Sequence, residues 1–344
     1  MNKVLYISSK NIQDSTVGGS QCAFRNYQAV CSYFGKENVR FLQIVFRKRF
    51  RFLHLFNKRE IIKNAKDMQV IFIESSIFGS LAKRIKKINK KARIITFFQN
   101  VEYDYFREEY SRKIIRKIIV KKIIFKNETL TCAYSDIIVS LNFRDSRRIE
   151  ELYGRKPDAV IPISFSDRDI KFSEEKIGIP PTALFLGSDF FANTHGILWF
   201  VKNVLPFVNM LLQIIGKDMN KVNFPHSDKL EMLGCVDDLE PYMQNADFMI
   251  YPIFKGGGMK VKTCEALMHG KNIIGTSEAF EGYDVDFEKV GACCETAEEF
   301  IEAINELPKR FTHKFNEYSR NVFLKKYSND VTFKQFAEVF EKCS

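Results

Sequence analysis

The sequence predicts an α/β protein of two domains, each built on a parallel sheet. Short apolar segments alternate with helix-forming segments along the 344 residues, the order that places helices on the faces of a parallel sheet. A strand followed by a glycine-containing turn and a helix occurs near the start of the chain and again from residue 182. A polar segment ending in Pro180-Pro181 separates two stretches, each of ordinary domain size.

The first predicted domain covers residues 1–165 and opens with a strand, a glycine-rich turn and a helix. The turn, Val17-Gly18-Gly19-Ser20, lacks the spacing of the dinucleotide-binding fingerprint, and it could also be a tight turn of purely structural use. The strands are expected at 3–9, 39–46, 69–74, 93–98, 136–141 and 159–163. The helices are expected at 21–34, 77–91, 107–126 and 142–153.

The second predicted domain covers residues 182–328, and a last helix occupies 329–344. Asn329 is expected to cap this last helix. Residues 164–181 form the predicted linker. The strands are expected at 182–186, 211–215, 247–252 and 272–275, with a loop at 232–238. The helices are expected at 197–208, 259–269, 300–307 and 314–326.

The stretch from Gly256 to Thr276 predicts an anion-binding site. Gly256, Gly257 and Gly258 cannot form a stable helix interior, because glycine loses more backbone entropy on folding than any other residue. Good helix formers follow, then Gly270 as a left-handed helix end, then a short apolar strand. A helix that begins at a glycine loop presents free backbone N–H groups and the positive end of its dipole.

Two lysines and one glutamate suit this helix to a phosphate joined to a sugar. Lys260 and Lys262 are expected in its first turn, where cations cost stability unless an anion lies between them. Glu265 lies three residues after Lys262, on nearly the same face, where its carboxylate could accept hydrogen bonds from sugar hydroxyls. The alternative is a glycine turn that caps a core helix with two solvated lysines.

This stretch resembles the nucleotide-sugar-binding segment of the GT-B glycosyltransferases, in particular the large retaining group known as family 4. In that family a glycine-rich loop precedes a helix with a Lys and a Glu, and a strand ending in Thr follows; here Lys262, Glu265 and Thr276 match. The run LFLGSDFFANTHGILWFVKNVLP resembles the first strand and loop of the family's donor domain. The resemblance implies two Rossmann-like domains facing across a cleft, with the last helix crossing back to the first domain.

The resemblance also implies roles for the matching residues. Lys260 and Lys262 would stabilise the departing diphosphate, and Glu102 is the third catalytic candidate. The donor-binding candidates are Gly187, Asn193, Gly234, Val236, Gly256, Gly257, Gly258, Met259 and Glu265. The candidates on the acceptor side of the cleft are Gly18, Gly19, Ser20, Gln99 and Asn100.

Three positions depart from the family pattern. Many members carry a further Glu eight positions before the one matched by Glu265, where this chain has Gly257. The family's acceptor-side His is replaced by Gln99, which cannot take up and return a proton as an imidazole does. One branch grips phosphate with an Arg and a Lys after the residue matched by Gly187, and this chain has neither. Phosphate contact therefore falls on Lys260, Lys262 and the glycine backbone.

The charge is unevenly divided along the chain. Residues 1–165 hold 33 Lys and Arg against 15 Asp and Glu, whereas the remainder holds 20 against 27. A basic half suits an anionic lipid surface, an anionic substrate or nucleic acid. Six Lys and Arg alternate with aromatic residues in 46–59, and 107–126 combines eight Lys and Arg with many Ile. Both segments suit anionic headgroups, and both are also compatible with ordinary amphipathic or solvated helices.

Cysteine usage, hydropathy and the N-terminus favour a cytoplasmic protein. The eight cysteines form no CxxC pair, which argues against a zinc site and for a reduced compartment. No apolar run approaches 18 residues, and the N-terminus enters VLYIS without a signal-peptide pattern. Asp284-Val285-Asp286 is a DxD string of the kind that binds metal in the other glycosyltransferase fold. GT-B enzymes generally work without a metal, so we expect none.

The sequence thus predicts a glycosyltransferase that moves a sugar from a UDP- or GDP-sugar, with retention and without a further cofactor. The expected acceptor is a glycan or a polyprenyl-diphosphate-linked glycan at the inner face of the cell membrane, in surface-polysaccharide assembly. A basic nucleic-acid-binding protein is the alternative from another class, although no recognisable RNA or DNA module accompanies the charge and no nucleic-acid partner is expected. A GT-B-fold sugar-nucleotide epimerase is a third hypothesis, which would need carboxylates and His in the cleft.

Overall fold

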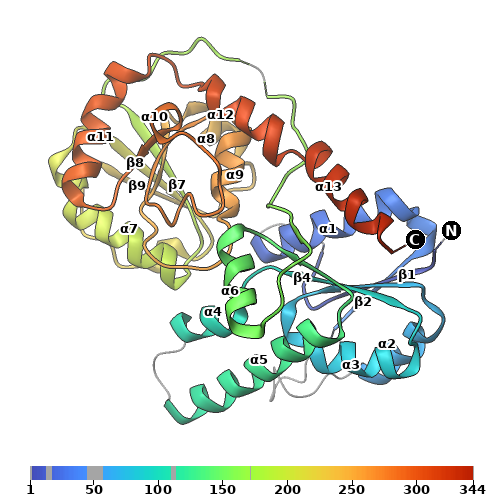
Figure 1. The fold of residues 1–344 in the computed structure, drawn as a ribbon. Helices are drawn as coiled ribbons and strands as arrows, with labels where there is room; N and C mark the ends of the chain where they lie inside the picture. Colours follow the sequence, from blue (N-terminus) through green and yellow to red (C-terminus); the bar gives the residue numbers. More distant parts are fainter. Residues whose placement is uncertain (1, 13–17, 45–56, 110–113, 171, 344) are drawn as a thin grey trace. The chain divides into compact units, whose positions relative to one another are not determined.

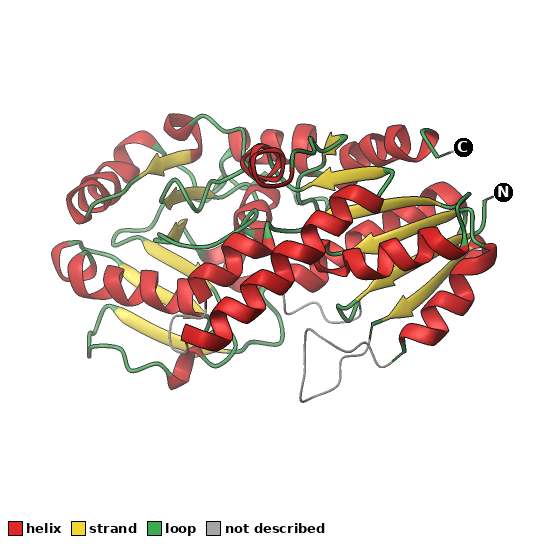
Figure 2. Cartoon of the chain, turned by 60° about the horizontal axis from the view of Figure 1, so that its bottom comes forward, coloured by secondary structure: helices red, strands yellow, loops and turns green. Residues whose placement is uncertain are grey.

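The computed structural model describes the chain except residues 1, 13–17, 45–56, 110–113, 171 and 344. It divides into two compact units (Figure 1): Met1–Ser164 together with Asn329–Ser344 form unit 1, and Phe165–Ser328 form unit 2. Each unit is a six-stranded sheet of parallel strands with helices packed against it (Figure 2). The predicted basic segment 46–59 lies mostly outside the described residues.

In unit 1 the strand order is β2-β1-β3-β4-β5-β6. The strands are β1 Val4–Ser8, β2 Val39–Gln43, β3 Val70–Glu74, β4 Arg93–Phe98, β5 Ile137–Ser140 and β6 Ala159–Val160. The helices are α1 Gly18–Phe34, α2 Lys58–Asn64, α3 Gly79–Ile88, α4 Glu102–Glu109, α5 Ile114–Tyr134, α6 Phe143–Tyr153 and α13 Asn329–Glu341. Short 3₁₀ helices occupy Lys36–Asn38, Ala65–Asp67 and Ser76–Phe78.

Both faces of the unit 1 sheet are buried, which explains why its strands are almost continuously apolar. On one face, Leu5 and Ile7 of β1 belong to the same buried cluster as Ile85 of α3. On the other face, Tyr6 stacks on Phe72 of β3 with ring centroids 5.0 Å apart. Alternate residues of one strand therefore pack against different helices, as the two-residue period of a strand requires.

The last helix, α13, packs on this second face and belongs to unit 1. Phe336 and Phe340 are fully buried, and the ring of Phe340 lies 5.1 Å from that of Phe34 in α1. Ser164 Oγ donates to Asn329 Oδ1 at 2.8 Å, which ties the end of the first segment to the start of the helix. Asn329 is the first residue of α13, and its side-chain oxygen accepts this hydrogen bond. Its capping role stays a prediction.

In unit 2 the strand order is β12-β11-β10-β7-β8-β9. The strands are β7 Thr182–Leu186, β8 Leu211–Ile215, β9 Leu230–Gly234, β10 Phe248–Tyr251, β11 Asn272–Gly275 and β12 Gly291–Cys293. The helices are α7 Phe191–Asn203, α8 Glu240–Asn245, α9 Val261–Met268, α10 Phe287–Val290, α11 Ala297–Arg310 and α12 Glu317–Val322. Leu205–Phe207 and Met219–Lys221 are 3₁₀ helices, and Phe323–Tyr327 is a π-helical turn.

Of the predicted linker, residues 164–181, all but Ser164 lie in unit 2. The carboxylate of Asp247 accepts hydrogen bonds from the backbone N–H groups of Gly178 at 3.0 Å and Thr182 at 2.6 Å. A buried carboxylate with two such donors fixes this segment against the start of β7. The segment is therefore packed against the sheet rather than being a solvated connection.

Several predicted helix starts are wrong, and packing explains the largest error. The helix expected from Ile197 begins at Phe191, and Gly196 lies inside it. A Cβ at Gly196 would lie 1.7 Å from the carbonyl oxygen of Pro252, so this glycine allows a close approach of α7 to the end of β10. Gly18 and Gly19 likewise form the first turn of α1 rather than a loop. The helices predicted from 77, 259, 300 and 314 begin at Gly79, Val261, Ala297 and Glu317.

The basic helix predicted at 107–126 is also wrong in its bounds, because the structure has α4 and α5 in this region. Residues 110–113 are not described. α5 continues to Tyr134 because its polar residues find partners inside unit 1. Glu128 accepts from Ser76 Oγ at 2.7 Å, and Thr131 Oγ1 donates to the Ser76 carbonyl at 2.5 Å.

Candidate functional site

Unit 2 has its topological switch point between β7 and β10, from which the chain winds outward in opposite directions. Open parallel sheets bind ligands outside the carboxyl ends of their strands at such a point. β7 is followed there by Gly187, and β10 is followed by the glycine loop, Gly256–Gly258. The predicted anion site therefore lies where the topology of unit 2 favours a ligand.

The glycine loop has the backbone geometry that its composition predicts. Gly256 has φ of 153° and Gly258 has φ of 58°, values that favour glycine. Lys260 is extended, and α9 begins at the next residue. The N–H groups of Val261 and Lys262 make no backbone hydrogen bond among the described residues, whereas Thr263 N donates to the Lys260 carbonyl at 3.0 Å. The first two N–H groups of α9 therefore remain available at the carboxyl edge of the sheet.

Lys260 binds the glycine loop itself. Its Nζ lies 2.6 Å from Glu278 Oε1 and donates to the carbonyls of Gly257 at 3.4 Å and Gly258 at 3.3 Å. The Lys260 and Glu278 side chains are only 11% and 16% exposed. In this arrangement a phosphate would have to share the ammonium with a carboxylate, so Lys260 is better suited to hold the loop in shape.

Lys262 meets two other predicted donor-site residues at the switch point. Its Nζ lies 2.7 Å from Asn193 Oδ1, and Asn193 Nδ2 donates to the Ser188 carbonyl at 3.0 Å, which fixes the orientation of the amide. Gly187 makes room, because a Cβ there would lie 2.9 Å from Lys262 Nζ. The ammonium also lies 4.6 Å from the centre of the Phe185 ring. Burial lowers the pKa of Lys262 to about 7.

Glu265 lies one turn further along α9. Burial raises the pKa of its carboxyl group, and in the described part of the chain it makes no hydrogen bond or ion pair. The backbone around it is held by Tyr251, whose hydroxyl donates to the Lys262 carbonyl at 3.2 Å. Met259, which precedes Lys260, is buried. Glu265 thus has acceptor capacity for a ligand.

Gly216, which was not among the predicted residues, lies between Gly234 and Gly187. Gly216 N donates to the Gly234 carbonyl at 2.7 Å, and a Cβ at Gly216 would lie 1.8 Å from the Gly187 carbonyl oxygen. These three glycines end β9, β8 and β7 at one edge of the sheet. Val236 follows Gly234 and makes no hydrogen bond to the glycine loop among the described residues.

Unit 1 brings together two of the predicted acceptor-side residues. Gln99 Nε2 donates to the Gly19 carbonyl at 3.1 Å and to Glu74 Oε1 at 2.7 Å. Ser20 is buried in the first turn of α1, and Asn100 is half-buried after β4. Glu74 was not among the predicted residues, although a carboxylate at the end of the otherwise apolar strand VIFIE is a signal for it.

Glu102 begins α4, and a buried carboxylate binds the start of that helix. Glu128 accepts from the Glu102 backbone N–H at 2.9 Å and from the Tyr153 hydroxyl at 2.6 Å. Burial raises the pKa of Glu128 to about 7, against the effect of these hydrogen bonds. Glu128 therefore binds the backbone of Glu102 at the start of a helix. This contact gives no evidence for a catalytic role of the Glu102 side chain.

The DxD string has structural partners. Asp286 caps α10 by accepting from the Glu288 backbone N–H at 3.0 Å, and Asp284 forms an ion pair of 2.6 Å with Lys326. Over the described residues no cluster of three or more His, Cys, Asp or Glu side chains is arranged to hold a metal ion.

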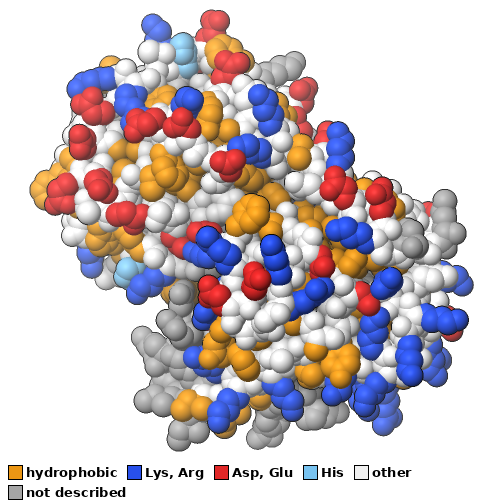
Figure 3. Space-filling view, in the orientation of Figure 1, with side chains coloured by type: hydrophobic (Ala, Val, Ile, Leu, Met, Phe, Trp, Pro, Cys, Tyr) orange, Lys and Arg blue, Asp and Glu red, His pale blue; other side chains and the backbone are white. Residues whose placement is uncertain are grey.

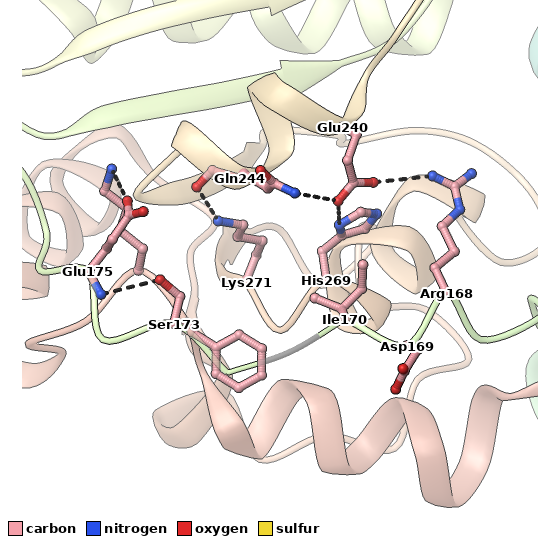
Figure 4. A pocket seen from close by; sticks show the side chains of 11 residues that line it. Arg168, Asp169, Ile170, Ser173, Glu175, Glu240, Gln244, His269 and Lys271 are labelled. Carbon is pink, nitrogen blue, oxygen red and sulfur yellow. Dashed lines mark hydrogen bonds and ion pairs between the residues drawn. The ribbon is translucent and has the colours of Figure 1, made fainter.

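A polar pocket of about 560 Å³ opens at the opposite, amino edge of the unit 2 sheet (Figure 4). Its polar side chains contact one another: Glu240 lies 3.5 Å from Arg168 and 3.6 Å from His269 Nδ1. Lys271 donates to the carbonyls of Gln244 at 3.1 Å and Ala246 at 2.9 Å, which end α8. Burial lowers the pKa of His269 to about 4, so its ring is neutral at pH 7. These contacts join α8 to the start of β11, and they lie away from the glycine loop.

Comparison with known proteins gives one family match and a set of similar folds. The family model of the glycosyl transferases group 1 matches residues 180–309. No curated protein is significantly similar in sequence. HepE of Anabaena in complex with UDP has a TM-score of 0.71 at 10% identity, covering 99% of this chain and 100% of that one.

Two further solved structures are similar over nearly the whole chain. A glycosyltransferase of Rickettsia africae has a TM-score of 0.69 at 14% identity, covering 99% of this chain and 98% of that one. Sucrose-phosphate synthase of Thermosynechococcus elongatus has a TM-score of 0.71 at 11% identity, with the same coverage. At these identities the likeness establishes the fold alone, and it confirms the predicted fold class.

Proposed function

We propose that this protein, whose residues 180–309 form a glycosyl transferases group 1 domain, transfers a sugar from a UDP- or GDP-sugar to a glycan or lipid-linked glycan. One observation carries the proposal: Lys262, Asn193 and Gly187 meet at the switch point of the matched domain, where the glycine loop leads into α9. HepE of Anabaena has been solved with UDP, with UDP and glucose, and with UDP-glucose, which makes UDP the first nucleotide to test.

The chemical step is the departure of a diphosphate. As the bond between the sugar and the β-phosphate breaks, negative charge grows on the phosphate oxygens. The N–H groups at the start of α9 and the Lys262 ammonium are oriented before the reaction, so they stabilise this charge without reorganising. Loss of one such donor typically costs ~3 kcal/mol of barrier. We assign this work to the protein groups rather than to a metal, and the family resemblance implies retention of configuration.

The remaining candidate residues complete this proposal. Glu265 would accept hydrogen bonds from the ribose, because its carboxylate lies one turn beyond Lys262 and can bind two hydroxyls. Gly234 and Val236 would contact the base through their backbone. Lys260 would act indirectly, by holding the glycine loop through Glu278.

Calorimetric titration of UDP and GDP tests the donor site. We expect one nucleotide to bind wild type with micromolar affinity and to bind Lys262→Ala at least 100-fold more weakly, the equivalent of about 3 kcal/mol. Lys255→Ala is the matched control, because Lys255 is exposed and immediately precedes the loop. Absence of binding by both nucleotides to folded wild type would refute the site. An equal loss in the two variants would attribute the effect to general charge.

We also propose that unit 1 binds the acceptor at an anionic membrane surface on the cytoplasmic side, in surface-polysaccharide assembly. Residues 1–165 carry the excess of Lys and Arg, and Figure 3 shows these side chains spread over the face of unit 1. On α5, Ile118 and Ile119 are 50% and 54% exposed, near the exposed Lys122. Basic and apolar groups side by side suit a lipid interface. No helix in the described ranges is long and apolar enough to span a membrane.

Vesicle sedimentation tests the membrane proposal. We expect the protein to sediment with phosphatidylglycerol-containing vesicles at low salt, to be released at high salt, and to ignore pure phosphatidylcholine vesicles. Ile118→Ser combined with Ile119→Ser should weaken the association. Phe287→Ser, which changes an exposed apolar residue of unit 2, should not. Failure of wild type to sediment at low salt would count decisively against a peripheral membrane protein.

A further inference from the structure

Unit 1 has its own switch point, between β1 and β3, and a polar cluster lies there. The strand order β2-β1-β3-β4 places the carboxyl ends of β1, β3 and β4 next to one another. Lys10 and Gly19 follow β1, Glu74 ends β3, and Gln99 follows β4. By the rule that applies to unit 2, this edge of the sheet is the preferred place for a ligand of unit 1.

The hydrogen bonds fix the orientation of the Gln99 amide. Its Nε2 has two protons, and it donates to Glu74 Oε1 at 2.7 Å and to the Gly19 carbonyl at 3.1 Å. A flipped amide would place Oε1 against a carboxylate and a carbonyl, both of which only accept. Gln99 therefore presents Oε1, a pure acceptor, to whatever lies beyond it.

Gly19 leaves a small space next to this oxygen. A Cβ at Gly19 would lie 3.2 Å from Gln99 Oε1 and 3.2 Å from Lys10 Nζ. Gln99 Oε1 and Lys10 Nζ therefore lie on either side of this space, no further apart than the two distances added together. They do not bond each other, and the Lys10 ammonium has no hydrogen-bond or ion-pair partner among the described residues. One hydroxyl can bridge such a pair, donating to Oε1 and accepting from the ammonium.

Glu74 holds this arrangement in place. Its side chain is buried, and it accepts from the Tyr6 hydroxyl at 2.6 Å and from Asn26 Nδ2 at 3.0 Å in addition to Gln99. Tyr6 and Asn26 are themselves buried in β1 and α1. The carboxylate thereby joins three elements of unit 1 and leaves the Gln99 amide one orientation.

We infer that Lys10, Gln99 and Gly19 form a binding site for one sugar hydroxyl, and that Glu74 is the positioning residue that orients Gln99 for it. We call this site the hydroxyl notch. The inference rests on the proposed function, which supplies a sugar substrate. It adds the direction of the two hydrogen bonds: the sugar hydroxyl donates to Gln99 Oε1 and accepts from the Lys10 ammonium. The hydroxyl could belong to the acceptor or to the transferred sugar, since both present the same chemistry.

Three variants remove the notch in different ways. Gly19→Ala fills it with a methyl group in the first turn of α1, where alanine is the better helix former, so the fold should be retained. Lys10→Met removes the donor, and Gln99→Met removes the acceptor. The readout is UDP release from UDP-glucose, UDP-galactose and UDP-N-acetylglucosamine, with and without a glycan acceptor. We expect each variant to lower kcat/KM at least tenfold while the Kd for UDP, bound by unit 2, stays within twofold of wild type.

The pattern of losses identifies the source of the hydroxyl. If it belongs to the donor, the variants lose the extra affinity of the UDP-sugar over UDP. If it belongs to the acceptor, that affinity is unchanged and the loss falls on turnover with acceptor. Wild-type kinetics in Gly19→Ala and Lys10→Met would overturn the notch. Absence of UDP binding to wild type would instead refute the proposed function, and the two failures are distinguishable.

The positioning role of Glu74 is tested in two ways, by the Gln99 amide resonances without substrate and by kinetics with substrate. In the side-chain amide spectrum of ¹⁵N-glutamine-labelled protein, Glu74→Gln should shift the Gln99 resonances, whereas Lys10→Met should leave them in place. In kinetics, Glu74→Gln should retain more activity than Glu74→Ala, because its amide oxygen can still accept from Gln99. Combining Glu74→Ala with Gln99→Met should cost no more than Gln99→Met alone. Additive losses, or Gln99 resonances unmoved by Glu74→Gln, would overturn the positioning role.

Discussion

Replacement of Lys262 by methionine is expected to raise the stability of unit 2 and to abolish nucleotide binding in the same protein. Burial lowers the pKa of this lysine from 10.5 to about 7, which means that the fold disfavours its charge. Methionine is of similar length and would pack on the same aromatic rings, those of Phe185 and Tyr251. The site would lose a charged donor, so we expect at least 100-fold weaker nucleotide binding together with a higher melting temperature.

The pH dependence of this gain has a definite sign. The unfolded lysine keeps its proton up to about pH 10.5, whereas the folded lysine loses it above about pH 7. Between these values the unfolded state binds more protons, so the stability of wild type rises with pH, by up to ~1.4 kcal/mol per unit. Lys262→Met has no such group. Its advantage over wild type should therefore be largest at and below pH 7 and should vanish toward pH 10.5.

Thermal unfolding at pH 6, 7.5 and 9 measures this difference, with Lys260→Met as the matched control. Lys260 neutralises Glu278 inside the loop, so its loss leaves a buried carboxylate without that ammonium and should lower stability. Two adjacent lysines would thus have opposite effects. A Lys262→Met protein that is less stable than wild type at every pH would show that the charged Lys262 does not destabilise the protein without nucleotide.

The contrast between these lysines also shows where sequence reasoning stops. Both are cations next to a glycine loop, and the sequence assigned both to the phosphate. They differ because Glu278 comes from the turn after β11 and Asn193 from α7, at a distance along the chain. Contacts between residues so far apart in the sequence are determined by strand order and packing, and the local sequence pattern holds no information on either. Glu74, which orients Gln99 from a neighbouring strand, was missed for the same reason.

Buried strands were predicted well, because continuous apolar runs leave little choice of structure. The strands at 93–98, 182–186, 211–215 and 272–275 have the predicted bounds. Helix starts were predicted poorly where a glycine has a tertiary use. Gly196 lies inside α7 because its missing side chain lets the helix contact Pro252, and no local signal distinguishes that use from a loop.

The second large effect is expected from Phe336→Ala in α13, which should destabilise unit 1 by about 3–5 kcal/mol. The ring is fully buried, 6.2 Å from Phe97 and 5.6 Å from Phe340 by centroids. It also lies 5.2 Å from the guanidinium carbon of Arg25. Arg25 is buried, and its Nε and Nη1 have no hydrogen-bond partner among the described residues, so the aromatic rings, together with the nearby Glu74 carboxylate, compensate for its charge. Phe336→Ala therefore removes both the packing of the ring and part of the compensation for the Arg25 charge.

Urea unfolding followed by circular dichroism measures the cost, and Glu338→Ala, an exposed change in the same helix, is the control. Because α13 belongs to unit 1 and the glycine loop to unit 2, Phe336→Ala should lower the first unfolding midpoint while UDP still binds at low urea. A cost within 1 kcal/mol of the control would mean that the core of unit 1 closes without this ring. Loss of UDP binding before any unfolding would instead show that α13 acts on unit 2, which its packing on Phe97 and Phe34 of unit 1 gives no reason to expect.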